Sequence, residues 1–112
     1  MLQQDVDVVF RALADPTRRR MLELLDEGPA TISQLAEPFD VSLTSITQHV
    51  RVLERSQLIS TTKQGRSRIC SLDRRSIERA RSWLDDRRSR WERRVDRLAE
   101  HLDAHPDPGD PR

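Results

Sequence analysis

The segment from Ser42 to Arg55 holds the side chains with the clearest capacity for molecular recognition. If this segment is helical, its hydroxyl, amide and guanidinium groups gather on one face, opposite an apolar stripe. Hydroxyl and amide groups near the start of a helix can hydrogen-bond base edges in the DNA major groove, and guanidinium groups further along can contact phosphates. The candidate DNA-contacting residues here are Ser42, Thr44, Ser45, Gln48, His49, Arg51 and Arg55, and the apolar stripe consists of Leu43, Ile46, Val50 and Leu53.

Several of these residues have a second interpretation. Ser42 caps the helix whether or not it contacts DNA. Arg51 and Arg55 are expected to meet phosphates, and the alternative is an ion pair with Glu54 or another neighbour. His49 lies between the two faces, where packing against the preceding helix competes with a phosphate contact.

The histidines do not predict catalysis or metal binding. His49 is one helical turn from Ser45, but nothing supplies an orienting carboxylate or an oxyanion hole, so we expect no enzyme. His101 and His105 are one turn apart near acidic residues, and the alternative to two surface histidines is a zinc site. We predict no metal and no cofactor.

Three further cations flank a turn signal at Gln64 and Gly65. The surrounding residues are rich in Thr, Ser and Ile and predict a β-hairpin in which Gly65 supplies a positive φ. Lys63, Arg66 and Arg68 would then lie where a duplex offers its backbone and minor groove. The alternative is a charged hairpin that only aids solubility.

Arg18, Arg19 and Arg20 open another predicted helix, where the helix dipole disfavours cations. An anionic partner such as a phosphate is therefore expected for at least one of them. Glu23 is the alternative partner, because it lies within one helical turn.

Charge is distributed unevenly along the chain. The net charge of +1 by itself argues against a nucleic-acid binder. Residues 1–40 contain four arginines and eight acids, whereas residues 41–69 contain five basic residues and one acid. Positive charge thus concentrates around the predicted DNA-contacting helix. Residues 74–100 carry ten arginines and six acids that alternate in sign, which is typical of a solvated helix face.

The elements that position these side chains follow from boundary signals. Four helices are predicted in the first half of the chain, and the third and fourth form a helix-turn-helix. The boundary signals are Asp15-Pro16 between the first two helices, Gly28-Pro29 after the second, a capping box at Thr31 and Gln34, Pro38 after the third, and the cap Ser42 before the fourth.

From Arg74 to about Asp103 the sequence predicts one long helix. Its apolar residues recur every seven positions with a second set between them, which is typical of a seam between subunits. These residues are Ile77, Leu84, Trp91 and Leu98, with Val95 and Leu102 at the complementary positions. Arg81 and Arg88 also occupy seam positions, so a simple two-stranded coiled coil is not expected. Residues 104–112 contain three prolines and predict a disordered tail.

Length and composition bound the remaining possibilities. A chain of 112 residues predicts one domain, assigned here to residues 1–103, without an elaborate active-site cleft. No apolar run approaches the roughly 18 residues of a membrane helix, so we expect a cytoplasmic protein with no membrane partner. Cys70, the single cysteine, can form no internal disulfide and is expected to be a small buried hydrophobic group.

Several motifs in register make the chain resemble the ArsR-type winged helix-turn-helix repressors. They are LADPTRRRMLELL, SLTSITQHVRVLE and the GRSRICSLD arm, in this order within residues 6–103. The PFDxS turn and the two tryptophans of the last helix, Trp83 and Trp91, resemble one branch of that family. The metal-sensing branch carries a cysteine pair where this chain has ISQLAEPFD, so the resemblance implies no such metal site.

The resemblance implies a homodimer in which the first and last helices build the interface and the hairpin serves as the wing. With the seam residues, the candidate interface residues are Val6, Val9, Phe10, Ile77, Leu84, Trp91, Val95, Leu98 and Leu102. The expected fold is mainly α with a small β-hairpin, a winged helix-turn-helix with a long C-terminal dimerisation helix.

The expected function is a sequence-specific regulator of transcription, a homodimeric repressor that binds an inverted-repeat operator in double-stranded DNA. The alternative is a protein-interaction module that uses the same scaffold and the arginine-rich last helix. An activator would share all of these residues, and no small-molecule effector follows from the sequence.

Overall fold

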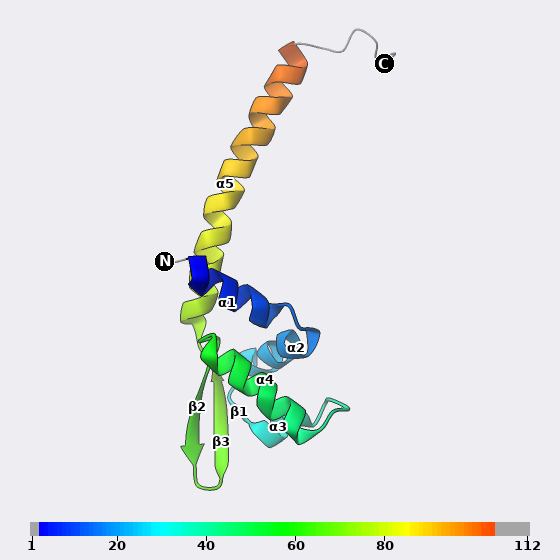
Figure 1. Cartoon of the computed structure of the whole chain (residues 1–112), viewed down its shortest axis with the longest axis vertical. Coiled ribbons are helices and arrows are strands. Elements are labelled where there is room, and N and C mark those ends of the chain that lie inside the picture. The colour runs from blue at the N-terminus through cyan, green and yellow to red at the C-terminus, as the bar shows by residue number, and fades with distance from the viewer. Residues whose placement is uncertain (1–2, 105–112) are drawn as a thin grey trace. The chain divides into compact units, whose positions relative to one another are not determined.

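The computed structural model describes residues 3–104, apart from the side chains of residues 3–5. Its order of elements is α1 (Gln3–Leu13), α2 (Pro16–Asp26), β1 (Ala30–Thr31), α3 (Ile32–Ala36), α4 (Leu43–Arg55), β2 (Ile59–Gln64), β3 (Ser67–Leu72) and α5 (Arg74–Ala104) (Figure 1). Contacts divide the chain into two compact units, Met1–Ala80 and Arg81–Arg112. The predicted mainly α fold with a β-hairpin and a long last helix is confirmed. The predicted tail lies outside the described residues, except for Ala104, which ends α5.

The predicted helix starts are confirmed by their capping hydrogen bonds. Asp15 accepts a hydrogen bond from the backbone N–H of Arg18 (3.0 Å), with Pro16 as the first residue of α2. Thr31 and Gln34 form the reciprocal capping box of α3. The hydroxyl of Ser42 accepts from the N–H of Ser45 (3.1 Å) and so starts α4. Each cap satisfies a backbone N–H that has no partner within its helix.

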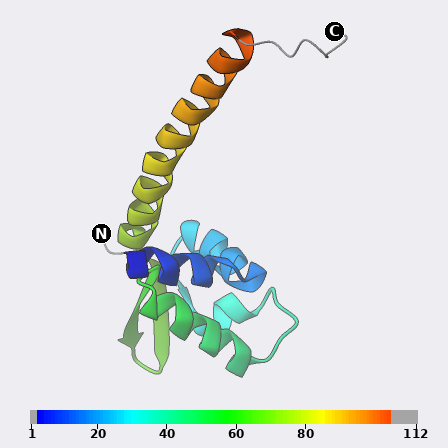
Figure 2. The same ribbon diagram turned by 45° about the horizontal axis from the view of Figure 1, so that its top comes forward.

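The core of the first unit lies between the helices and the sheet. Buried side chains from α1, α2, α3, α4 and the hairpin form one cluster. Its members that are exposed by 1% or less are Ala12, Met21, Leu35, Ile46, Leu53, Leu58 and Cys70. In two views α4 lies beside both α3 and the hairpin, which it contacts (Figure 1 and Figure 2). The core therefore fixes the orientation of α4.

Three side chains correct the sequence-based assignments. Val6 and Val9, predicted in the dimer interface, are only 1% and 4% exposed within this single chain, so neither has surface to offer a partner. Leu43, predicted in the packed stripe of α4, is 54% exposed because it lies at the first turn, beyond the reach of the core. Cys70 is fully buried as predicted, and its burial raises the pKa of the thiol.

The sheet contains one strand that sequence patterns did not predict. The strand order is β1-β3-β2, with Ala30 and Thr31 of β1 paired to Cys70 and Ile69 of β3. Strand β1 has two residues, and the second, Thr31, is also the cap of α3. So short a segment carries no strand periodicity, and β1 is recognised only through its pairing with β3. The hairpin pairs Gln64 with Ser67, which makes Gly65 and Arg66 the two-residue loop. Gly65 has the predicted positive φ, 62°.

Helix α4 ends in a turn that places Gln57 in the left-handed region, with φ at 60°. The N–H of Leu58 bonds the carbonyl of Leu53 and the N–H of Gln57 bonds that of Glu54, both at 3.0 Å, which is the Schellman arrangement. Glycine adopts this φ at less cost than glutamine.

We therefore expect Gln57→Gly to raise the free energy of unfolding by a few tenths to about 1 kcal/mol, measured by urea denaturation. Gln64→Gly is the matched control. It removes a strand side chain where no positive φ is needed, so it should lower stability. A loss of stability in Gln57→Gly would show that the backbone strain at this turn is negligible.

Helix α5 begins at a charged cap. One carboxylate oxygen of Asp73 accepts from the N–H of Arg75 (3.0 Å) and the other from its guanidinium (2.7 Å). The side-chain hydrogen bond from Arg75, followed by the backbone one, lowers the pKa of Asp73 to about 2 from the ordinary 3.8. A lowered pKa in the folded state adds stability above the unfolded pKa, and this stability is lost as the pH falls toward 2.

Asn caps helices as well as Asp but does not titrate. We expect wild type and Asp73→Asn to differ in free energy of unfolding by a constant amount above about pH 5. Below this pH the difference should shrink by a few tenths to about 1 kcal/mol, since the exposed guanidinium of Arg75 leaves the pair screened by solvent although Asp73 itself is largely covered. Urea denaturation between pH 2 and 7 measures this, and a pH-independent difference would contradict the role of the Asp73 charge.

None of the helices between residues 3 and 104 combines the length and apolar character that a membrane crossing requires. The part of α5 in the second unit instead carries an exposed apolar stripe. It consists of Leu84, Trp91, Val95, Leu98 and Leu102, each 44–62% exposed.

Candidate DNA-binding surface

The outward face of α4 presents the predicted polar residues to solvent. Ser42, Thr44, Gln48, Arg51 and Arg55 are exposed, and Ser45 and His49 are half-buried. A shallow hollow of about 270 Å³ lies on this face and is lined by Leu43, Thr44, Thr47, Gln48 and Arg51. The structure thus brings the predicted residues together on one side of one helix.

The cations of α4 are not neutralised by the neighbour that the sequence suggested. Glu54 instead accepts a hydrogen bond from the hydroxyl of Thr61 on β2. The Nε of Arg55 donates to the carbonyl oxygen of Arg51 (3.4 Å). Within residues 3–104, neither Arg51 nor Arg55 forms an ion pair, so both guanidinium charges remain available to an anion.

His49 makes the packing contact that was its alternative role. Its Nδ1 lies 3.3 Å from a guanidinium nitrogen of Arg18, which joins α4 to the start of α2. The same guanidinium donates to the carbonyl oxygens of Ala12 (2.7 Å) and Arg11 (3.0 Å) at the end of α1. Arg18 therefore ties three helices together and restrains the half-buried side of α4.

The three arginines that open α2 have partners within the protein. Arg19 donates to the carbonyl oxygen of Leu13 (2.7 Å), and Arg20 pairs with Glu23 (3.2 Å). Because the carbonyl end of α1 is negative, it compensates for cations at the unfavourable end of α2. Arg20 thus has the alternative partner predicted from the sequence, Glu23. At Arg18 and Arg19, backbone carbonyl oxygens take the place expected for phosphate.

Asp15 adds a carboxylate to this junction. Burial by itself would raise the pKa of Asp15, but the backbone N–H of Arg18 and the adjacent positive charge outweigh it, so the pKa is lowered. Asp15 therefore stays ionised beside Arg18, 4.0 Å away.

The hairpin places its three cations unequally. Lys63 and Arg68 are directly opposite each other in the antiparallel register, and Arg66 lies in the two-residue loop. Arg68 donates to the hydroxyl of Thr61 (3.0 Å), whereas Lys63 and Arg66 have no polar partner within residues 3–104. Like charges directly opposite each other in a sheet repel, and a bound polyanion would relieve this repulsion.

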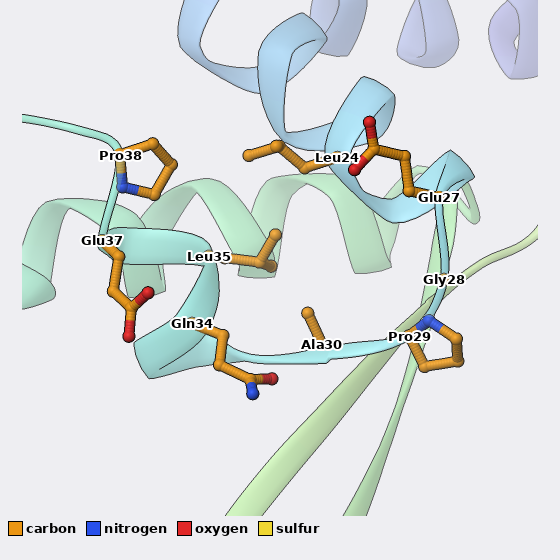
Figure 3. A pocket seen from close by; sticks show the side chains of 9 residues that line it. All are labelled: Leu24, Glu27, Gly28, Pro29, Ala30, Gln34, Leu35, Glu37 and Pro38. Carbon is orange, nitrogen blue, oxygen red and sulfur yellow. The ribbon is translucent and has the colours of Figure 1, made fainter.

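A hollow near the end of α2 has the wrong charge for DNA. It measures about 660 Å³ and lies between the end of α2 and α3, with Leu24 and Leu35 facing each other across it (Figure 3). Its charged lining residues are Glu27 and Glu37. These carboxylates repel phosphates, so α4 and the hairpin remain the candidate DNA-binding surface.

Apart from the buried Val6 and Val9, the predicted interface residues divide into two groups. Phe10 and Ile77 are half-buried and pack against the core of the first unit. The residues of the exposed stripe on α5 stay open to solvent in the single chain. Arg81 and Arg88 pair with Asp85 along the helix, and the guanidinium of Arg87 stacks over Trp83 at 4.4 Å.

The possible zinc site falls partly outside the structure. His101 is an exposed residue of α5, and His105 lies outside the described residues. Between residues 3 and 104, no group of three His, Cys, Asp or Glu side chains is placed to hold a metal ion.

Comparisons with known proteins agree with this arrangement. A sequence family described as "Helix-turn-helix domain" matches residues 13–62, which include α3, α4 and most of β2. Transcriptional repressor SdpR of Bacillus subtilis (strain 168) is 36% identical over 76 residues, covering 68% of this chain and 84% of that protein. The HTH-type transcriptional regulator Rv2034 of Mycobacterium tuberculosis is 33% identical over 101 residues, covering 90% of this chain and 92% of that protein.

A solved structure supports the same assignment. The crystal structure of the ArsR family transcriptional regulator RHA00566 is 42% identical, with a TM-score of 0.79, and the match covers 82% of this chain and 95% of that chain. Together with the packed helix-turn-helix and the hairpin, these matches identify the chain as a member of the ArsR-type winged helix-turn-helix family of DNA-binding transcriptional regulators.

Proposed function

We propose that two copies of this chain bind an inverted-repeat operator and repress transcription by blocking polymerase access. The observation that carries the proposal is the outward face of α4, which combines small polar side chains with guanidinium groups that have no ion-pair partner within residues 3–104. Such a face has no role in packing, because the buried residues of α4 lie on the other side.

Helix α4 would enter the major groove through its first two turns. Thr44 and Gln48 would read base edges, and Gln can pair with adenine through two hydrogen bonds. The exposed Leu43 adds an apolar group suited to a thymine methyl. Ser42, Ser45 and His49 would support this contact, while Arg51 and Arg55 would bind phosphates.

The hairpin would grip the flanking duplex as a wing. Arg66 is exposed in its loop, and Lys63 faces Arg68 across the strands. Phosphates bound close to Lys63 and Arg68 would reduce the repulsion between these two cations. This gain exists only in the complex.

Dimerisation would bury the exposed stripe of α5. Five large apolar side chains along one face of α5 are costly to leave in water. A symmetric pair would place two copies of α4 about one helical turn of DNA apart. The relative named as a transcriptional repressor favours repression over activation.

Selection from random duplexes tests the proposal. We expect the selected sites to share an inverted repeat and the affinity to fall with salt, with a slope near −0.9 per neutralised phosphate. Gln48→Ala should relax the preference at one or two base pairs, whereas Arg51→Ala should weaken binding to all duplexes alike.

The alternative function, a protein-interaction module, predicts a different outcome. Such a module would enrich no palindrome and would show little dependence on salt. Equal losses on operator and random DNA for Gln48→Ala would refute its role in base reading.

A further inference from the structure

A further hollow, smaller than the two described above, lies in the first unit. Its lining residues come from α1, the end of α4 and the first turns of α5. Its volume of about 170 Å³ is below the range of pockets for drug-sized ligands, so it suits a small ion or the polar end of a small molecule. It is lined by Val8, Val9, Arg55, Ser56, Gln57, Ser76 and Arg79.

Two buried serines in this hollow differ in their hydrogen bonding. Ser56 is 4% exposed, and its hydroxyl donates to the carbonyl oxygen of Leu53 (2.9 Å). Ser76 is 2% exposed, and its hydroxyl has no hydrogen-bond partner among the described residues. The hydroxyl oxygen of Ser76 is not among the fully buried side-chain atoms that lack a partner, so it is open to the hollow, and an acceptor that enters the hollow can receive its hydrogen bond.

The charges of the lining residues have one sign. Arg55 and Arg79 contribute two guanidinium groups, and no lining residue is acidic, although acids and bases are nearly equal in number in the whole chain. Ser76 is also the third residue of α5, where the helix dipole favours an anion. Positive charge and an unused donor thus coincide.

Gln57 links the strained turn to this hollow. Its amide oxygen accepts a hydrogen bond from the guanidinium of Arg79 (3.2 Å) and thereby restrains it. The residue holds a left-handed backbone conformation that glycine would adopt at lower cost. Backbone strain of this kind is found at functional sites. Here it is accompanied by a side chain, that of Gln57, which positions Arg79.

We propose that this hollow binds a small oxyanion, a phosphate or a carboxylate. The hydroxyl of Ser76 donates to it, and Arg79 and Arg55 neutralise it. An adjoining hollow of about 240 Å³ shares the Val8, Arg55 and Ser56 walls and adds Ala12 and Val52, so an organic anion with a short apolar group also has room. A link between this anion and DNA, through the shared Arg55, rests on the proposed function, whereas the site itself does not.

Thermal unfolding of the full chain without DNA tests the site. Inorganic phosphate or acetate replaces chloride at constant ionic strength. We expect Tm to rise with the concentration of at least one of these anions, because a ligand that binds only the folded state stabilises it. The dissociation constant obtained should increase about tenfold or more in Ser76→Ala and in Arg79→Gln. Gln57→Gly should weaken anion binding while making the protein without anion more stable.

Arg66→Gln is the matched control, because it removes the same charge from the hairpin loop and should leave anion binding unchanged. The proposal is overturned if neither anion raises Tm beyond chloride, or if Ser76→Ala and Arg79→Gln respond like wild type. It is also overturned if these variants weaken only duplex binding, since a DNA phosphate would then be the occupant. The anion titration contains no DNA, so failure of operator selection would leave it unaffected.

Discussion

Thr44→Glu is expected to weaken operator binding about 100-fold while leaving the fold intact. Thr44 is exposed in the first turn of α4, where no acidic residue is present. A carboxylate there interacts favourably with the helix dipole, by about 0.3–1 kcal/mol. Against DNA it faces phosphates, and two like charges about 6 Å apart at an effective dielectric constant of about 20 repel by about 3 kcal/mol. Fluorescence anisotropy with the selected operator measures the affinity, and urea denaturation measures the stability.

Two controls separate the effect of a negative charge at position 44 from the effects of side-chain size and of the protein's net charge. Thr44→Gln has nearly the same size as the Glu variant without its charge, so it should lose much less affinity. Ser89→Glu changes the net charge equally on the face of α5 opposite the apolar stripe, and should bind the operator like wild type. If Thr44→Glu retained full affinity, α4 would not be the reading helix.

Leu98→Glu is expected to dissociate the proposed dimer without unfolding the protomer. Leu98 is 56% exposed in the single chain, so its replacement removes no contact from the core. In a symmetric interface each substitution counts twice, and each buried leucine contributes about 1.5–3 kcal/mol. The dissociation constant of the dimer should therefore rise by about 1,000-fold or more. Analytical ultracentrifugation measures this rise, and circular dichroism verifies that helix content is kept.

The DNA-binding consequence provides a second readout. Monomers of Leu98→Glu should bind one half-site with nearly the affinity of a wild-type protomer but lose the advantage of the inverted repeat. Ser89→Glu again serves as the control, since it should remain dimeric. A wild-type protein that sediments as a monomer at micromolar concentration, or an unaltered dimer in Leu98→Glu, would exclude the α5 stripe as the interface.

Local signals in the sequence determined most of the elements of this protein. Asp15, Thr31 and Ser42 start helices by accepting a hydrogen bond from the backbone N–H three residues further along, and a rule of such short range can be read from nearby letters of the sequence. The turn at Gly65 follows from one residue that tolerates positive φ. The polar face of α4 was likewise predictable, because helical periodicity alone brings Thr44, Gln48 and Arg51 together.

Only the tertiary structure decided which side chains are covered and which stay exposed. The periodicity of α1 marks Val6 and Val9 as apolar, but whether they pack within the chain or against a partner depends on residues far along the sequence. The same holds for strand β1, for Arg18 joining three helices, and for the hollow that Ser76 lines. These features arise from contacts between distant residues, and a pattern that repeats every two, four or seven positions carries no information about them.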